Sequence, residues 1–439
     1  MKRVLIIVHL PRASPRIAGL VNHLAEFGWE STILTGATSQ YKDLPARIVE
    51  TPYRDALGLL GRLLRVNPAE DARRQFYHRL GIVSKKSPLD FFFSLGGEVV
   101  NYPCPDKNWK PFALQAGNKL LQEENIDAIV SSSPPVTSHI VARELKAKYK
   151  TPWLADFRDL WLQNANYAYG ALRRLLDRRL ELKTLSSADA LVTVSEPLAE
   201  KLRALHKGKP VYAITHGFDP AEVNVPPAKL TAKFTITYAG LLYSRRQDPT
   251  RLFAALRELT LNRTLNPEEI EVNFYGPEEG WLHQEIGRYA LSGIVKQNGI
   301  VPHQVALQKE RESQVLLLLD WDDPQEKGVY TGKIFEYLGA RRPILATGGT
   351  KGDVVDQLLK ETGAGVHAPT VEDVKIALKE LYREYKLKGE VTYRGKESEI
   401  NKYSHREMAR KFADILDHLA TNNPPQIHSV GFDKHTSSQ

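Results

Sequence analysis

The sequence predicts two doubly wound α/β units, because the chain is long enough for two domains and strands alternate with helices twice along it. Two domains are the expected number for 439 residues. The first series opens with the apolar run Arg3–His9, continues with apolar residues at helical spacing over 17–25, and returns to a short apolar segment at 31–35. A strand, a helix and a strand in this order form a βαβ unit, which predicts a parallel sheet.

The alternation continues through both halves of the chain. In the first half we expect strands at 128–131, 153–155, 190–194 and 211–214, and helices at 138–149, 171–185 and 197–205. In the second half we expect strands at 234–238, 271–275, 315–319 and 343–346, and helices at 249–259 and 333–338. Pro220, Pro226 and Pro227 are typical of a linker, so we expect an N-terminal unit over 1–214 and a C-terminal unit over 215–400.

Two segments do not follow the alternation. Residues 55–112 mix basic residues with apolar clusters such as Phe91–Phe93, which fits either a membrane-surface element or an excursion that packs its aromatic side chains internally. Residues 421–439 are polar and show no periodicity, so we expect a disordered tail.

The composition narrows the class of protein. Apolar residues make up 42% of the chain and charged residues 26%, which is typical of soluble globular enzymes and excludes wholesale disorder. No apolar run is long enough to span a membrane, and the stretch Val4–Leu10 is interpreted as a strand and not as a signal peptide. The single cysteine, Cys104, excludes an internal disulfide and a zinc site of paired cysteines, and it favours a reducing, cytoplasmic setting.

Positive charge is concentrated in the first half. Residues 1–214 contain 31 Lys and Arg against 21 Asp and Glu, whereas the remainder contains 29 against 31. This imbalance indicates that the N-terminal half meets an anionic surface or substrate. Nucleic acid and acidic lipid headgroups both fit the charge, but we recognise no nucleic-acid-binding module and expect no nucleic-acid partner.

The segment 328–349 carries the clearest chemical signal. The leucine strand at 315–319 leads through an acidic loop and a glycine into a short helix, and ligands of open α/β sheets bind beyond the carboxyl ends of strands. Thr331 and Gly332 are expected at the helix N-terminus, which attracts anions, and Lys333 adds a positive charge. Glu336, one turn later, can accept two hydrogen bonds from a ribose diol. Together these residues predict a nucleoside diphosphate site; the alternative is an ordinary strand–helix–strand element with a capping threonine.

A second segment points to the same ligand. Gly240 ends the strand expected at 234–238, and Arg245 and Arg246 follow it; the guanidinium fork suits a diphosphate, although the pair could simply be solvated at a loop. Gly276 closes another strand and could line the pocket of the base.

These segments resemble GT-B glycosyltransferases of family 4, the retaining group that uses nucleotide sugars, over roughly residues 1–420. The helix beginning Lys333-Ile-Phe-Glu336 and followed by Arg342-Pro343-Ile344 resembles the signature in which the glutamate binds the donor ribose. The exopolysaccharide branch of the family has segments similar to 27–35, 131–135 and 156–161. Residues 216–219 are similar to the family's hinge. Tyr403-Ser404 resembles the start of the closing helix, expected at 401–420, which packs back on the N-terminal domain.

The resemblance implies a GT-B fold, in which two Rossmann-like domains face each other across a cleft. It implies an N-terminal acceptor-binding domain and a C-terminal domain that binds a nucleotide-sugar donor. The implied activity is transfer of the sugar, with retention, to a glycan or lipid-linked acceptor in surface polysaccharide biosynthesis. We expect neither a metal nor another cofactor, and a cytoplasmic protein in peripheral contact with the inner face of the plasma membrane.

The chain also departs from the family pattern. Gly328 stands where the family has the first of two glutamates, and Glu326 or Asp323 are candidate substitutes. Leu241 replaces the arginine after the strand-end glycine, so the diphosphate clamp is assigned to Arg246 with Lys333, helped by Arg245. Because of these departures, a catalytically degenerate binding protein is one alternative interpretation. A nucleotide-sugar 2-epimerase is the other, and it would need carboxylates and histidines around the cleft.

Asp156, Arg158 and Asp159 are the candidate catalytic residues of the N-terminal half. Arg158 corresponds to a histidine often found at the sugar end of family sites. Asp159 is expected to bond the sugar or to orient Arg158, and Asp156 either positions the acceptor hydroxyl or forms a buried Asp–Arg pair that shapes the loop. Asp320-Trp-Asp322 has the spacing of a metal-binding pair, but cationic side chains and a helix N-terminus favour a metal-free site.

Overall fold

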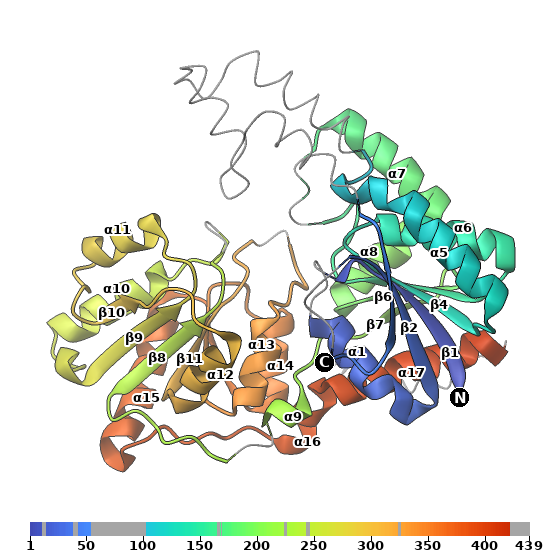
Figure 1. The fold of residues 1–439 in the computed structure, drawn as a ribbon. Helices are drawn as coiled ribbons and strands as arrows, with labels where there is room; N and C mark the ends of the chain where they lie inside the picture. The colour runs from blue at the N-terminus through green and yellow to red at the C-terminus, as the bar shows by residue number, and fades with distance from the viewer. Residues whose placement is uncertain are drawn as a thin grey trace, which may run out of the picture. The chain divides into compact units, whose positions relative to one another are not determined.

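The computed structural model describes residues 1–10, 15–37, 43–53, 102–164, 167, 169–223, 226–242, 246–323 and 326–421. The chain divides into two compact units, each built on its own sheet (Figure 1). Unit 1 comprises Met1–Thr193, Ala199–Tyr212 and Ala409–Gln439, and unit 2 comprises Val194–Leu198 and Ala213–Met408. Most of the excursion expected over 55–112, Arg245, and the expected tail after Thr421 lie outside the described residues.

Unit 1 contains a seven-stranded sheet in the order β3-β2-β1-β4-β5-β6-β7. Its pairs from β3 to β6 run parallel, as the βαβ pattern predicts. The strands are β1 (Lys2–Ile7), β2 (Trp29–Gly36), β3 (Arg47–Thr51), β4 (Ala128–Ser133), β5 (Trp153–Phe157), β6 (Ala190–Thr193) and β7 (Val211–Ala213). The helices beside them in sequence are α1 (Pro15–Leu24), η2 (Ala25–Phe27), η3 (Pro105–Trp109), α5 (Lys110–Glu123), α6 (Thr137–Tyr149), α7 (Ala171–Leu185) and α8 (Glu196–Leu205).

Unit 2 contains a parallel six-stranded sheet in the order β10-β9-β8-β11-β12-β13. The strands are β8 (Phe234–Ala239), β9 (Ile270–Tyr275), β10 (Val295–Gln297), β11 (Val315–Leu319), β12 (Ile344–Thr347) and β13 (Gly365–Ala368). The helices are α9 (Pro220–Val223), α10 (Thr250–Leu261), η4 (Pro267–Glu269), α11 (Gly280–Arg288), α12 (His303–Glu312), α13 (Lys333–Ala340), α14 (Val354–Thr362), α15 (Val371–Lys388), α16 (Glu397–Ile400) and η5 (Asn401–Tyr403).

The central strand β11 shows why an unbroken leucine run forms a strand here. Val315, Leu317 and Leu319 join a buried cluster with side chains of α10, α11 and α15, whereas Leu316 and Leu318 join a second cluster with α13 and α14. Successive side chains of a strand point to opposite faces, so a strand covered by helices on both faces is apolar at every position. The run therefore fixes α13 against the sheet.

The last helix, α17 (His405–Thr421), begins in unit 2 and belongs to unit 1 from Ala409 onward. In unit 1 the Trp29 indole donates to Asp417 over 3.1 Å, and the Arg16 guanidinium lies 5.1 Å from the centroid of the Phe412 ring. The C-terminal helix thus supplies part of the packing around the first βαβ unit. Among the described residues, no helix is long and apolar enough to cross a membrane.

Candidate functional site

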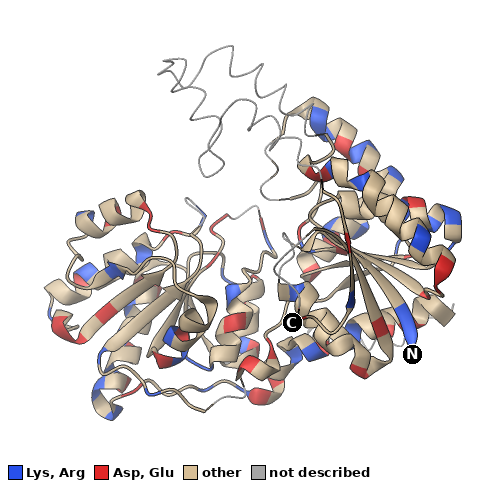
Figure 2. Cartoon of the chain, viewed as in Figure 1, with Lys and Arg blue, Asp and Glu red and all other residues tan. Residues whose placement is uncertain are grey.

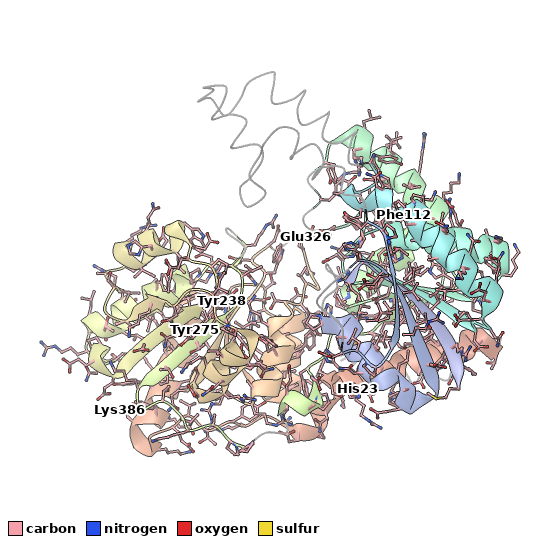
Figure 3. The ribbon with its side chains drawn as sticks, viewed as in Figure 1. His23, Phe112, Tyr238, Tyr275, Glu326 and Lys386 are labelled. Atoms are coloured by element: carbon pink, nitrogen blue, oxygen red, sulfur yellow. The ribbon has the colours of Figure 1, made fainter. Side chains whose placement is uncertain are left out.

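Two glycines mark the carboxyl ends of β8 and β9. The Gly240 amide donates to the Tyr275 carbonyl over 2.7 Å, and a Cβ built on Gly276 would lie 2.3 Å from the Gly240 oxygen. Gly240 and Gly276 also have φ angles of +123° and +153°, which side chains rarely allow. Figure 3 labels Tyr238 and Tyr275, which precede the two glycines on neighbouring strands. Both positions therefore require glycine, because the two strand ends touch through their backbones.

Lys333 lies against this pair of glycines. A Cβ on Gly240 would come within 2.4 Å of the lysine Cε, so a side chain at residue 240 would displace the end of the lysine. The Lys333 Nζ donates to the Leu241 carbonyl over 3.2 Å and lies 5.1 Å from the centroid of the Tyr238 ring. Desolvation lowers the pKa of Lys333 to about 8. A partly desolvated cation at a strand end is a favourable place for an anion.

The same lysine begins helix α13, whose N-terminus lies at the end of β8. Gly332 is exposed, and a Cβ there would meet no atom within 4 Å. The Tyr337 hydroxyl accepts from the Ala239 amide over 3.1 Å, which anchors the helix to the end of β8. The Thr331 Oγ1 is buried and has no hydrogen-bond partner among the described residues. The positive end of the helix dipole makes such an N-terminus a favourable place for an anion.

Glu336 shares the outward face of α13 with Lys333. The two are three residues apart, whereas Ile334, Phe335 and Tyr337 are buried. The Glu336 Oε2 lies 3.9 Å from the Nδ1 of His303, whose Nε2 is 3.7 Å from the Glu222 Oε1. These two carboxylates raise the pKa of His303, with Glu222 the larger influence. His303 was not a candidate in the sequence, because nothing near it in the chain marks it as a partner of Glu336.

Arg246 is held by an acidic residue in this structure. Its guanidinium pairs with Asp323 and lies 5.5 Å from the centroid of the Trp321 ring, and its carbonyl accepts from the Asp322 amide over 2.9 Å. The guanidinium expected to clamp a diphosphate with Lys333 is thus engaged by a carboxylate, and the clamp stays a prediction. Because Asp323 is held in this ion pair, it is also a poor substitute for the carboxylate missing at Gly328.

A different residue places a carboxylate beside Gly328. The Gly328 amide donates to both oxygens of Asp353, each over 3.2 Å. Asp353 occupies the N-cap position of α14, but its side chain makes no capping bond to that helix. The sequence offered Glu326, which lies in the same loop as Gly328 (Figure 3), as the other substitute. Asp353 was missed because it follows Gly328 by 25 residues.

The two aspartates of the Asp320-Trp-Asp322 pattern lie in different environments. Asp320 is buried and accepts from the Trp321 amide over 2.7 Å, and burial raises its pKa to about 7. Asp322 instead pairs with Arg251 over 2.7 Å. Within the described part of the chain, no three His, Cys, Asp or Glu side chains are grouped so that they could hold a metal ion.

The three N-terminal candidates differ in what surrounds them. Asp156 is fully buried: its Oδ1 lies 3.0 Å from the Arg16 Nη2, and its Oδ2 accepts from the Ser132 hydroxyl over 2.7 Å. The structure thus favours the alternative of a buried pair, with Arg16 and not Arg158 as the partner. The buried Arg158 donates to the Pro134 carbonyl. Asp159 is exposed just after β5.

Much of unit 1 matches a known domain family. Residues 13–213 match the family model described as a glycosyl transferase 4-like domain. The matched residues thus resemble a glycosyl transferase 4-like domain, and the fold of the chain is of the GT-B type. A search of curated protein sequences finds no match.

The GT-B fold extends along nearly the whole chain. Sucrose-phosphate synthase from Thermosynechococcus elongatus has 14% identity and a TM-score of 0.61, with 96% of this chain and 100% of that chain covered. HepE from Anabaena, solved in complex with UDP and glucose, has 12% identity and a TM-score of 0.52, with 96% and 98% covered. A putative UDP-N-acetylglucosamine 2-epimerase from Listeria monocytogenes has 13% identity and a TM-score of 0.50, with 97% and 98% covered. At these identities the likeness shows the fold.

The buried pair of Asp156 and Arg16 yields a stability prediction. We expect Asp156→Asn to lower the free energy of unfolding by about 3–5 kcal/mol, because it leaves the buried Arg16 charge uncompensated. Asp159→Asn, at an exposed position after the same strand, is the control and should leave the melting temperature unchanged. Thermal unfolding followed by circular dichroism measures both. Equal melting temperatures for the two variants would contradict the structural role of Asp156.

Proposed function

We propose that the chain transfers a sugar, with retention, from a nucleotide-diphosphate sugar to a glycan or lipid-linked acceptor in surface polysaccharide biosynthesis. The observation that carries this proposal is the position of Lys333 against Gly240, at the N-terminus of α13, with Glu336 on the same helix face. A diphosphate would meet the ammonium group and the positive end of the helix dipole, while Glu336 would accept from the ribose hydroxyls. The UDP-bound HepE structure supports a nucleotide ligand for this fold.

In this proposal the departing diphosphate is stabilised by fixed positive potential. Negative charge builds up on the leaving oxygen as the glycosidic bond to the donor breaks, and preorganised donors lower the barrier most when they face that oxygen. Lys333 and the amides at Gly332 supply such donors without a metal or another cofactor. Arg246 would join them only by exchanging Asp323 for a phosphate oxygen.

In unit 2 we assign the sugar end of the donor to Asp353. This residue holds a carboxylate at Gly328, where the family resemblance has a glutamate, and would accept from a sugar hydroxyl. In unit 1 the exposed carboxylate of Asp159 remains our candidate for a substrate contact, and Arg158, which donates to the Pro134 carbonyl, is the candidate cation beside it in the chain.

The membrane side of the proposal rests on α7. Its buried face is largely polar and includes the Arg173–Asp177 ion pair, whereas Leu172, Leu175 and Leu176 are 66%, 46% and 39% exposed. Figure 2 shows Lys and Arg positions along α7 in blue. The exposed basic residues of the helix are Arg174, Arg178, Arg179 and Lys183. Leucines beside arginines suit the headgroup region of an anionic bilayer. We therefore propose that α7 brings this cytoplasmic protein to the inner face of the plasma membrane.

A nucleotide panel tests the donor site. UDP, GDP, ADP and TDP are each added to the chain, and we expect one of them to raise the melting temperature, because a ligand that binds the native state stabilises it. Glu336→Ala should abolish this shift and the transfer activity, whereas Asp353→Ala should keep the shift and lose transfer. Binding without turnover of any nucleotide sugar would favour the catalytically degenerate protein, and no shift with any nucleotide would refute the proposal.

The lowered pKa of Lys333 gives the nucleotide affinity a pH dependence. As pH rises through about 8 the ammonium charge is lost, so the affinity of the wild-type chain should fall between pH 7 and pH 9. Lys333→Met should bind about tenfold more weakly at pH 7 and should lack this decline. Isothermal titration at several pH values measures both, with Lys386→Met, at the exposed lysine of α15 labelled in Figure 3, as the matched control.

Vesicle binding tests the role of α7. We expect the chain to sediment with phosphatidylglycerol-containing vesicles and not with pure phosphatidylcholine, since the arginines need anionic lipid. The triple variant Leu172→Ser, Leu175→Ser, Leu176→Ser should lose this binding, because the apolar contribution of the helix is removed. Leu387→Ser, at a leucine of α15 that is 79% exposed, is the matched control. Vesicle binding of the triple variant at the wild-type level would exclude α7 as the contact.

A further inference from the structure

Helix α15 carries an exposed stripe of residues that the proposed function does not use. The α15 stripe consists of four residues: Ile376, Glu380, Arg383 and Leu387. They follow one another at steps of four, three and four positions, so they share one side of the helix. The opposite side is buried in the core of unit 2 through Val374, Leu378 and Tyr382. All four stripe residues are exposed, Ile376 to 50% and Leu387 to 79%.

The α15 stripe borders a hollow at the edge of the second sheet. The hollow has a volume of about 710 Å³, and all four stripe residues line it. Gly365 and Val366 of β13 and the later residues Thr392 and Arg394 also line it. β13 is the last strand of its sheet, and Val366 is 41% exposed. An edge strand beside exposed apolar side chains is suited to contact with another protein surface.

The two charged residues of the stripe are available to a partner. Beside them, Glu384 already pairs with Lys388 over 2.9 Å and with Arg394 over 2.8 Å. Glu380 and Arg383, in contrast, form neither an ion pair nor a hydrogen bond within the described part of the chain. Their spacing of three residues would allow a pair on one helix, so it is notable that the two side chains do not meet.

The order of the stripe indicates which partner would fit. In a two-fold symmetric contact both subunits use the same face, and antiparallel packing of two helices reverses the order of the residues on one of them. Reversal about the middle of the stripe places Ile376 opposite Leu387 and Glu380 opposite Arg383. Apolar side chains then face apolar ones, and each carboxylate faces a guanidinium. The stripe is therefore complementary to itself.

We propose that two copies of the chain associate through α15, with the two helices antiparallel and Glu380 of each copy paired with Arg383 of the other. Ile376 and Leu387 of each copy would be covered by the other copy and removed from water. Exposed ion pairs contribute little affinity, so the charges set the register while the apolar contacts supply most of the stability. None of these residues belongs to the proposed donor site.

Sedimentation velocity tests the association. A contact built on one helix face is small, so we expect a reversible dimer that forms between about 1 µM and about 100 µM. The mass of the wild-type chain should rise over this range from 49.5 kDa toward twice that value. Glu380→Arg sets arginine against arginine, and Arg383→Glu sets glutamate against glutamate. Each variant should raise the dissociation constant of the dimer at least about tenfold, because like charges would face each other twice.

Mixing the two charge variants tests the antiparallel register. In an equimolar mixture of Glu380→Arg and Arg383→Glu, arginines of one copy face glutamates of the other, so the mixture should dimerise although each variant alone does not. Glu200→Arg, at an exposed position of α8, is the matched control and should dimerise like wild type. The melting temperatures of the charge variants, compared with wild type at about 1 µM, should be unchanged, because exposed substitutions rarely alter stability.

Leu387→Ser tests the apolar contribution to the contact. It removes an exposed leucine, so it should weaken the dimer about tenfold without lowering the melting temperature at about 1 µM. Helix α7 is intact in this variant. In the vesicle experiment it therefore shows the effect of losing the dimer alone.

The possible outcomes support or overturn the proposal. A wild-type chain that stays monomeric at the highest concentration would overturn it. A wild-type dimer that tolerates both charge reversals, or a mixture of the two variants that stays monomeric, would overturn it as well, because the contact would then lie on another surface. These results are independent of whether the chain binds a nucleotide.

Discussion

The fit of the Lys333 side chain against Gly240 determines how the proposed donor site is built. A side chain at residue 240 would displace the end of the lysine from β8, and Gly276 must be glycine because the neighbouring strand end touches the same backbone. Once Lys333 is in place, the helical spacing of α13 puts Glu336 beside it. A helix docked on a strand end thus aligns a cation, a helix N-terminus and a carboxylate.

Features with a strong local pattern could be predicted from the sequence. The bounds of β11 and α7 agree with the expected 315–319 and 171–185, since an unbroken apolar run and a long helical stretch after Gly170 are visible within one segment. The same alternation predicted that Gly240 and Gly276 follow strands and that Lys333 and Glu336 lie in the first turns of a helix, whereas their role in donor binding stays a prediction. The weaker elements β3, β10 and β13 were missed, and so were α5, α11, α12, α14 and α15, whose patterns are short or strongly polar.

The remaining features depend on contacts between distant parts of the chain. The carboxylate at Gly328 comes from Asp353 in the loop after β12, and the partner of Asp156 is Arg16, 140 residues away. The sequence around Arg246 predicts phosphate binding, but in the structure its guanidinium forms an ion pair with Asp323. His303 looks like an ordinary residue of a polar helix until α12 is packed against α13. Charge and residue type identify candidate site residues, but which of these residues come into contact depends on how the chain packs.

The division of unit 1 into three separate stretches of chain has a consequence for any attempt to dissect the molecule. Trp29 in the second strand bonds Asp417 near the end of α17, and Arg16 lies against Phe412 of the same helix. A fragment ending at Tyr212 would expose the indole and the aromatic contact surface to water, although it would contain every strand up to the last of the first sheet. The halves are therefore better separated as a circularly permuted or co-expressed pair, in which the final helix travels with the beginning of the chain.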